Sequence, residues 1–191
     1  MKKLAFITLG ILPFSYAQAS IEKLTVYGHR DSLIGESISA SSGIIGQGEI
    51  QQRPMLRSAE LLELIPSMAV TQHSGSGKAN QYFIRGFNLD HGTDFATNID
   101  GMPINLPSHG HGQGYTDLNF IIPESISSIN YQKGSYIATQ GDFSSAGSAN
   151  FNLIDTLTHQ QVSLSIGEDN YKRATVLAST DVTKGKLMAA A

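Results

Sequence analysis

Residues 82–119 read YFIRGFNLDHGTDFATNIDGMPINLPSHGHGQGYTDLN, and they carry the clearest structural signals in the chain. A short apolar run at 82–84 predicts a strand, and a second run at 96–99 ends on Asp100-Gly101. Asp-Gly after a strand is a strong turn signal, because both central residues of a type I′ turn need positive φ. The chain then returns through residues 102–105 into a loop rich in glycine and histidine. The stretch therefore predicts two short β units that hold a polar loop on a rigid base.

Two motifs in this stretch resemble a known family. Phe-Ile-Arg-Gly-Phe at 83–87 is followed by a strand and then by Ile-Asp-Gly-Met-Pro-Ile at 99–104. In this order they resemble the centre of the plug domain of TonB-dependent outer-membrane receptors. Other blocks agree in order and spacing, among them Leu-Leu-Glu-Leu-Ile-Pro-Ser at 61–67. The resemblance implies an α+β plug domain over residues 41–155, built from a small mixed β-sheet with short helices.

Length and composition limit the class of protein. The 191 residues fit one domain, and 15% of them are charged, against ~25% in an average soluble domain. With 19 glycines, this composition indicates a chain rich in strands and turns. The net charge of -3 and the lack of a Lys/Arg cluster give little support to nucleic-acid binding. The absence of cysteine excludes disulfides and thiolate metal sites.

The first residues carry an export signal. Lys2-Lys3 gives a positive start, residues 4–14 are mostly apolar, and Ala17-Gln18-Ala19 forms an A-x-A cleavage site. This pattern predicts a secretory signal peptide over residues 1–19.

The segment after the predicted cleavage site alternates apolar and polar residues, Ile21 to Tyr27. Such a segment can add a strand to the sheet edge of a partner, and an ordinary first strand is the alternative interpretation. The segment is similar to a TonB box, so the resemblance implies a TonB-binding segment and linker over residues 20–40. The residues that it assigns to binding the energy-transducing protein TonB are Glu22, Lys23, Leu24, Thr25 and Val26.

Short helices are expected before the central stretch. Residues 42–53 predict a loop leading into one helical turn before Pro54. Ser58 is a candidate cap for a second helix, in which apolar residues recur at i, i+3, i+4 and i+7. Pro66 limits that helix to about two turns, because proline cannot continue the helical hydrogen bonds.

The last part of the chain predicts membrane strands. Residues 161–167 alternate strictly, residues 171–179 form a second β-like run, and residues 167–170 predict a turn between them. Alternation over about ten residues between turns is typical of outer-membrane barrel strands. Residues 156–191 are therefore expected to be the first strands of an incomplete transmembrane β-barrel. Two strands cannot close a barrel, so Ala191 is interpreted as a truncation point.

The turn after residue 84 and the loop after Pro103 hold the candidate binding residues. The resemblance places both near the outer apex of the plug, facing a ligand vestibule. Loops held on a rigid scaffold are where binding residues collect. Arg85 has two interpretations, a pair with a buried carboxylate or a contact with an anionic ligand. The candidate ligand-facing residues are Arg85, Phe87, His91, Asp94, His109, His111 and Tyr115.

Histidines in this region raise the hypothesis of a metal site. His91, His109 and His111 are the candidate ligands, because neutral imidazole is the commonest metal ligand and suits zinc, nickel, copper or iron. His109 and His111 alternate, so both rings face one side if the chain is extended. The loose spacing, which matches no known zinc pattern, favours a structural role or a general polar contact over direct metal binding.

The resemblance implies energised uptake of a scarce nutrient, such as a siderophore, a metal complex, haem or cobalamin. TonB would pull on the N-terminal segment in the periplasm, the plug would lie inside a barrel in the outer membrane, and no catalysis and no resident cofactor are expected. The alternative is a secreted or periplasmic histidine-rich metal-binding module or metalloenzyme. A metalloenzyme would need an open coordination position and a general base beside its ligands.

Overall fold

The computed structural model describes residues 35–72 and 77–191. The predicted signal peptide and the predicted TonB-binding residues 22–26 lie outside the described residues.

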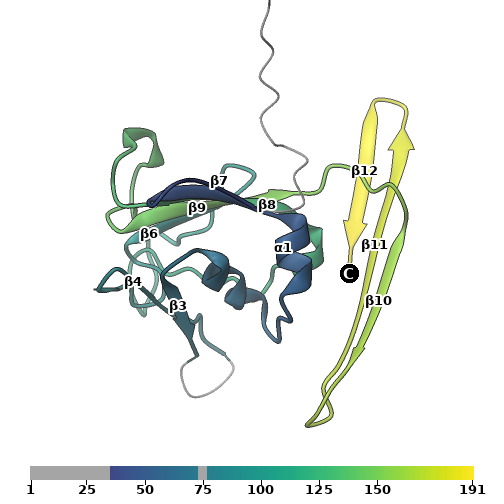
Figure 1. Ribbon diagram of the computed structural model, residues 1–191, viewed down its shortest axis with the longest axis horizontal. Coiled ribbons are helices and arrows are strands. Elements are labelled where there is room, and N and C mark those ends of the chain that lie inside the picture. Colours follow the sequence, from purple (N-terminus) through teal and green to yellow (C-terminus); the bar gives the residue numbers. More distant parts are fainter. Residues whose placement is uncertain (1–34, 73–76) are drawn as a thin grey trace, which may run out of the picture. The chain divides into compact units, whose positions relative to one another are not determined.

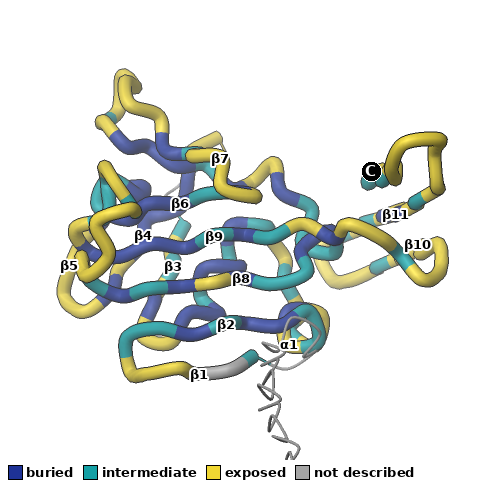
Figure 2. The backbone as a smooth tube through the Cα atoms, turned by 90° about the horizontal axis from the view of Figure 1, so that it is seen from above, coloured by how far each residue is buried: buried dark blue, intermediate teal, exposed yellow. Residues whose placement is uncertain are grey.

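A six-stranded mixed sheet is the centre of the fold, in the order β1-β2-β8-β9-β6-β7 (Figure 2). The pairs are antiparallel except for β6 and β9, which run parallel. The strands are β1 (Glu36–Ser39), β2 (Ser42–Gly46), β6 (Phe95–Ile99), β7 (Met102–Pro103), β8 (Ile126–Lys133) and β9 (Gly147–Leu153).

Short helices cover one face of this sheet and enclose the hydrophobic core. Figure 1 shows α1 (Gln47–Gln52) on the same face as the coil of η1 (Ser58–Leu64). Alternate residues of the central strands, such as Ile129 and Phe151, pack into this core with no exposed surface. The two other 3-10 turns are η2 (Pro123–Ser125) and η3 (Ala138–Gln140).

The other face of the sheet is polar, because side chains alternate along each strand. Asn150 Nδ2 donates a hydrogen bond of 2.7 Å to Asn152 Oδ1, and Asn152 Nδ2 donates one of 2.9 Å to Ser128 Oγ. These amides and the hydroxyl therefore satisfy one another across β8 and β9.

A second, three-stranded sheet contains the predicted strand at 82–84. It consists of β3 (Met68–Thr71), β4 (Gln81–Ile84) and β5 (Phe87–Asn88), all antiparallel. Arg85 and Gly86 connect β4 to β5 with φ of 49° and 84°. The expected α+β architecture, with mixed sheets and few helices, is confirmed.

A third antiparallel sheet follows, made of β10 (Gln161–Ile166), β11 (Lys172–Val182) and β12 (Gly185–Ala190). The two strands and the turn predicted there are confirmed, and the sequence did not predict β12. Val162, Leu164 and Ile166 on β10 are 71%, 77% and 85% exposed. Across residues 35–72 and 77–191, no helix is both long and apolar enough to cross a membrane.

Two local predictions were wrong. Residues 42–46 form β2 rather than a loop, because they pair with β8 and bury Ile45 in the core. Ser58 does not cap a helix: Arg57 is the residue before η1, and the Ser58 hydroxyl donates to the carbonyl of Ile121 instead. Tertiary contacts overrode the local signal in both places.

Candidate functional site

The base of the candidate site is the β6–β7 hairpin. Asp100 and Gly101 form its turn with φ of 46° and 79°, so the predicted positive-φ turn is confirmed. Asp100 Oδ1 accepts the backbone N–H of Leu153 at 3.0 Å, which ties the turn to β9. Asp100 is therefore a turn residue.

Asn105, which follows the hairpin, holds the surrounding loops together. Its side chain is buried, and Nδ2 lies 3.1, 3.0 and 3.0 Å from the carbonyl oxygens of Gly92, Phe95 and Gly114. Its Oδ1 accepts the N–H of Thr97 at 2.7 Å. The sequence did not predict this role for Asn105. The one available signal was the position of an asparagine directly after the apolar residues 102–104.

The loop between residues 106 and 115 closes on itself. Leu106 and Tyr115 form an isolated antiparallel bridge, and the N–H of Gly114 donates to the carbonyl of Leu106 at 2.7 Å. The N–H of Thr116 donates to the carbonyl of His91 at 2.8 Å, which joins this loop to the turn after β5. The two candidate segments therefore lie side by side.

His91 is buried, with 1% of its surface exposed, and adopts a φ of 69°. Its Nδ1 lies 2.7 Å from the carbonyl oxygen of Ala79 and 3.2 Å from that of Asn80. Because carbonyl oxygens only accept, Nδ1 carries the proton and the lone pair of the neutral ring is on Nε2.

The other two histidines lie against Tyr115. The His109 ring stacks on the Tyr115 ring with 4.0 Å between centroids, and the His111 ring meets it edge-on at 6.0 Å. The His111 ring also meets the His91 ring at 4.6 Å. The Tyr115 hydroxyl accepts the N–H of Ala79 at 2.7 Å, so the ring around which the histidines gather is itself fixed.

The possible metal ligands that the structure brings together differ from the sequence-based set. One side-chain ligand atom from each of Asp90, His91 and His111 lies within 4.8 Å of the others. His109 does not belong to this group, and its Nδ1 accepts the backbone N–H of His111 at 3.2 Å. Within the described chain, this is the one group of three or more such residues that could hold a metal ion.

Asp94 and Asp117 have other partners. Asp94 Oδ1 accepts the Ser145 hydroxyl at 2.8 Å, and Asp117 Oδ1 accepts the N–H of Asn119 at 2.9 Å. Both carboxylates therefore hold local chain geometry.

Arg85 and Phe87 lie on the hairpin that precedes this cluster. Arg85 Nη2 donates to the carbonyl of Ala40 at 3.2 Å and to the Ser41 hydroxyl at 3.0 Å, so its partners in the described structure are neutral oxygens. Phe87 is 45% exposed.

Two buried polar atoms lie on the strand segment beside His91. Asn80 Oδ1 and the Tyr82 hydroxyl have no hydrogen-bond partner among the described residues. Burial raises the pKa of Tyr82, and the neighbouring Asp117 and Tyr115 raise it further, so the phenol stays neutral. Native proteins satisfy most buried polar groups, so these two atoms are exceptions to the usual pairing.

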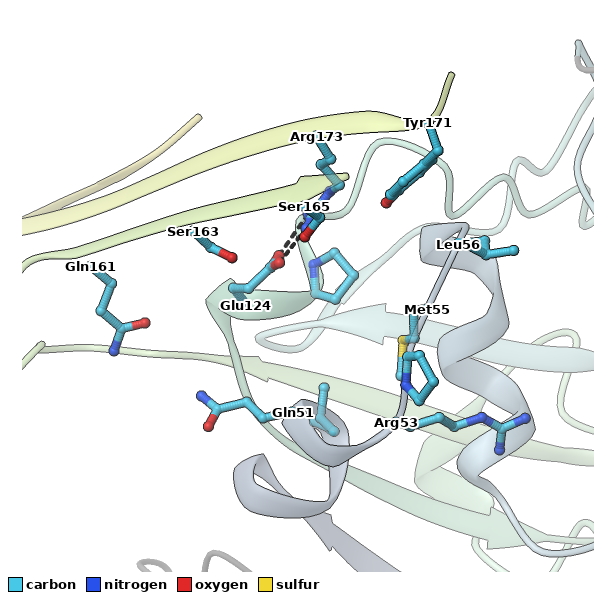
Figure 3. A pocket seen from close by; sticks show the side chains of 13 residues that line it. Gln51, Arg53, Met55, Leu56, Glu124, Gln161, Ser163, Ser165, Tyr171 and Arg173 are labelled. Atoms are coloured by element: carbon cyan, nitrogen blue, oxygen red, sulfur yellow. Dashed lines mark hydrogen bonds and ion pairs between the residues drawn. The ribbon is translucent and has the colours of Figure 1, made fainter. Parts of the chain in front are cut away.

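Two cavities lie in the described structure, and one of them borders this cluster. One, of about 420 Å³, opens beside Asp90 and is lined by Gln81, Phe83 and Asn88, among others. The other, of about 590 Å³, lies between α1 and the β10–β11 hairpin, and Figure 3 shows Glu124 and Arg173 paired at its wall. The hydrogen bond from Arg173 holds the pKa of Glu124 below its ordinary value, against the effect of burial. No sequence motif predicted this pair.

The chain matches the family model of the TonB-dependent receptor plug domain over residues 35–148. A curated relative, the vitamin B12 transporter BtuB of Vibrio vulnificus, is 24% identical over 167 residues, which make up 84% of this chain and 26% of the relative. The chain therefore spans about a quarter of the length of this relative.

Solved structures of similar fold include the copper transporter OprC, at 19% identity and a TM-score of 0.61 over 82% of this chain and 24% of that one. The hemophore receptor HasR of Serratia marcescens is 23% identical with a TM-score of 0.59, over 78% of this chain and 23% of that one. These relatives are transporters and receptors, not enzymes. The chain belongs to the family of TonB-dependent receptor plug domains.

Proposed function

We propose that this chain is the plug-containing part of an outer-membrane receptor that imports a scarce, metal-containing nutrient with energy from TonB. The proposal rests on one cluster of aromatic rings, in which the imidazoles of the three candidate histidines pack around the phenol ring of Tyr115. The rings come from two loops that Asn105 and the Thr116–His91 hydrogen bond join, so the surface is preformed. Preformed surfaces lose little entropy when a ligand binds.

The surface that we propose to face the ligand contains the residues expected from the sequence. Phe87 is exposed, and the imidazoles of His109 and His111 lie on Tyr115. Asp94 and Arg85 support the surface through their hydrogen bonds to Ser145 and Ser41. The proposed ligand-facing set is Arg85, Phe87, His91, Asp94, His109, His111 and Tyr115.

The relatives support a metal-containing nutrient as cargo. One is named as a transporter of vitamin B12, one as a transporter of copper, and one was solved with its hemophore and heme. Each of these cargoes contains a metal ion. A siderophore, a metal complex, haem and cobalamin all fit this class, and the metal belongs to the cargo rather than to a resident cofactor.

We further propose that residues 22–26 bind TonB by adding a strand to its sheet, and that residues 1–19 direct export. In strand addition the backbone supplies much of the affinity, so proline, which lacks an N–H, disrupts it. Thr25→Pro is therefore the sharpest variant, and Thr25→Ala is its matched control.

The proposal is tested in a strain that lacks the receptor gene, complemented with the parent gene, Thr25→Pro or Thr25→Ala. Cells are grown with cyanocobalamin, haemin, zinc chloride or copper sulfate as the scarce source, and cellular metals are measured by mass spectrometry. The deletion and Thr25→Pro should lower the same element, whereas Thr25→Ala should match the parent. Unchanged metal content in the deletion strain would contradict metal uptake, and normal uptake by Thr25→Pro would contradict the TonB role.

A further inference from the structure

We propose that Asp90, His91 and His111 bind a divalent transition metal ion directly, with His91 using Nε2. The inference rests on the proposed function, because the ion would be the cargo or the metal of a small complex. It replaces His109 in the sequence-based set with Asp90, since among residues 35–72 and 77–191 the group that brings its ligand atoms within 4.8 Å of one another is Asp90, His91 and His111.

The chemistry of the donors selects the class of ion. Two imidazoles and one carboxylate suit zinc, copper, nickel or iron, whereas magnesium and calcium prefer oxygen ligands alone. Ligand atoms about 2.0 Å from a tetrahedral zinc ion lie ~3.3 Å apart. Asp90 and His111 are exposed, so rotation of their side chains can shorten the observed separation.

His91 is already prepared for this role. Metal-binding histidines usually donate their other ring N–H to a carbonyl or carboxylate, which fixes the tautomer and the ring orientation. The Nδ1–H of His91 donates to the carbonyls of Ala79 and Asn80, which leaves the lone pair on Nε2. This tautomer directs the lone pair of His91 to the ring nitrogen that a metal ion would use. A second imidazole and a carboxylate lie nearby, and a purely structural role for His91 would not need that combination.

The backbone around the cluster is constrained as well. Asp90, His91 and Gly92 adopt consecutive positive φ angles of 38°, 69° and 104°. A Cβ on Gly92 would lie 2.8 Å from Thr116 Cβ, so the turn is packed against the segment that follows the histidine loop. The turn therefore presents Asp90 outward while the ring of His91 stays buried.

Three protein ligands leave part of the coordination sphere open on the exposed side of the cluster. An open position is what distinguishes a reactive or exchangeable site from a closed structural one. A cargo ion must enter and leave, so this arrangement fits a transient binding site.

The test is calorimetric titration of the purified 191-residue chain, without a polyhistidine tag, with zinc chloride. The parent should bind one zinc ion. Asp90→Asn and His111→Ala should each lower the zinc affinity about tenfold or more. His159→Ala, which changes an exposed histidine in another part of the chain, should change the affinity less than threefold, and His109→Ala should weaken binding less than Asp90→Asn does.

Nuclear magnetic resonance of ¹⁵N-labelled histidine provides a readout that needs no variant. Zinc should shift the Nε2 signal of His91 and leave its Nδ1 protonated. The assignment would be overturned if the parent bound no zinc, or if all four variants weakened zinc binding equally. It would also be overturned if His109→Ala abolished zinc binding and Asp90→Asn did not, or if zinc shifted the Nδ1 signal of His91. These measurements involve neither TonB nor a membrane, so zinc binding can fail while energised uptake in cells stands.

Discussion

Arg173 in β11 donates two side-by-side hydrogen bonds to the carboxylate of Glu124 in η2, with 2.7 Å between Nη2 and Oε2. The two residues are 49 positions apart in the sequence, and their side chains are 30% and 25% exposed. Paired bonds of this kind add geometric specificity as well as energy. The contact links the plug fold to the sheet formed by β10, β11 and β12.

Glu124→Gln should lower the free energy of unfolding by roughly 1 kcal/mol, because the pair is bidentate but partly exposed to solvent. Chemical denaturation followed by circular dichroism measures the loss. Glu168→Gln, in the exposed turn between β10 and β11, is the control and should stay within about 0.5 kcal/mol of the parent. Equal stability of the two variants would show that the ion pair contributes nothing measurable.

The same pair predicts a pH dependence. The pKa of Glu124 is lower in the folded chain than its ordinary value of 4.5, chiefly because of the hydrogen bond from Arg173. The folded state therefore binds fewer protons than the unfolded state in this range. The stabilisation is complete above the unfolded pKa and is lost as the pH falls through the folded pKa. Denaturation at several pH values should show the difference between parent and Glu124→Gln shrinking below about pH 4.5; a difference that persists in acid would contradict this linkage.

Asn105→Ala should destabilise the loops around the candidate site by about 2–4 kcal/mol, because the buried N–H of Thr97 loses its acceptor and three carbonyl oxygens each lose a donor. Asn105→Asp should do nearly the same, since a carboxylate accepts from Thr97 but cannot donate to the three carbonyls. Hydrogen exchange at the Thr97 amide is the local readout. Asn119→Ala, which removes an exposed amide bonded to Asp117, is the control, and comparable losses in both alanine variants would refute the special role of Asn105.

Gly147→Ala should disrupt the pairing of β8 and β9. A Cβ at Gly147 would lie 2.3 Å from the backbone oxygen of Gln132, and its φ is 146°. Backbone strain and this collision should together cost about 2 kcal/mol or more, measured by denaturation. Gly185→Ala meets no atom within 4 Å and should stay close to the parent. If Gly147→Ala has the same free energy of unfolding as the parent, then β8 and β9 can move apart at the Gly147 end at little cost.

The sequence predicted features whose cause is local. Asp100-Gly101 forms a turn because both residues accept positive φ, and β10 alternates because Val162, Leu164 and Ile166 lie on one face of the strand. The strand at 42–46 was missed because it lies between two partners: β8 is more than 80 positions away, and the short neighbouring strand β1 has no clear strand pattern. Likewise β12, which reads GKLMAA, does not alternate clearly between apolar and polar residues.

In the candidate site, too, the features with a local cause were predictable and those that depend on distant residues were not. Asp-His-Gly at 90–92 predicts a turn, and a turn forms there, but the inward direction of the His91 ring depends on carbonyls at positions 79 and 80. The choice between His109 and Asp90 as a companion of His91 likewise depends on how two loops meet. Neither Asn105 nor the Glu124–Arg173 pair had a motif, because their partners come together only in the folded chain.

Side chains alternate between the two faces of β11, so the Glu124–Arg173 contact can form only when β11 has the observed register with β10. An offset of one residue in β11 would turn Arg173 away and present Lys172 or Ala174 to the carboxylate. The same offset would exchange the faces occupied by Val176 and Thr175, which are exposed and buried in the observed alignment. With Ala174 in that place Glu124 would lose its partner, so a plug that folds first can act as a template that disfavours this misaligned hairpin through one unpaired charge.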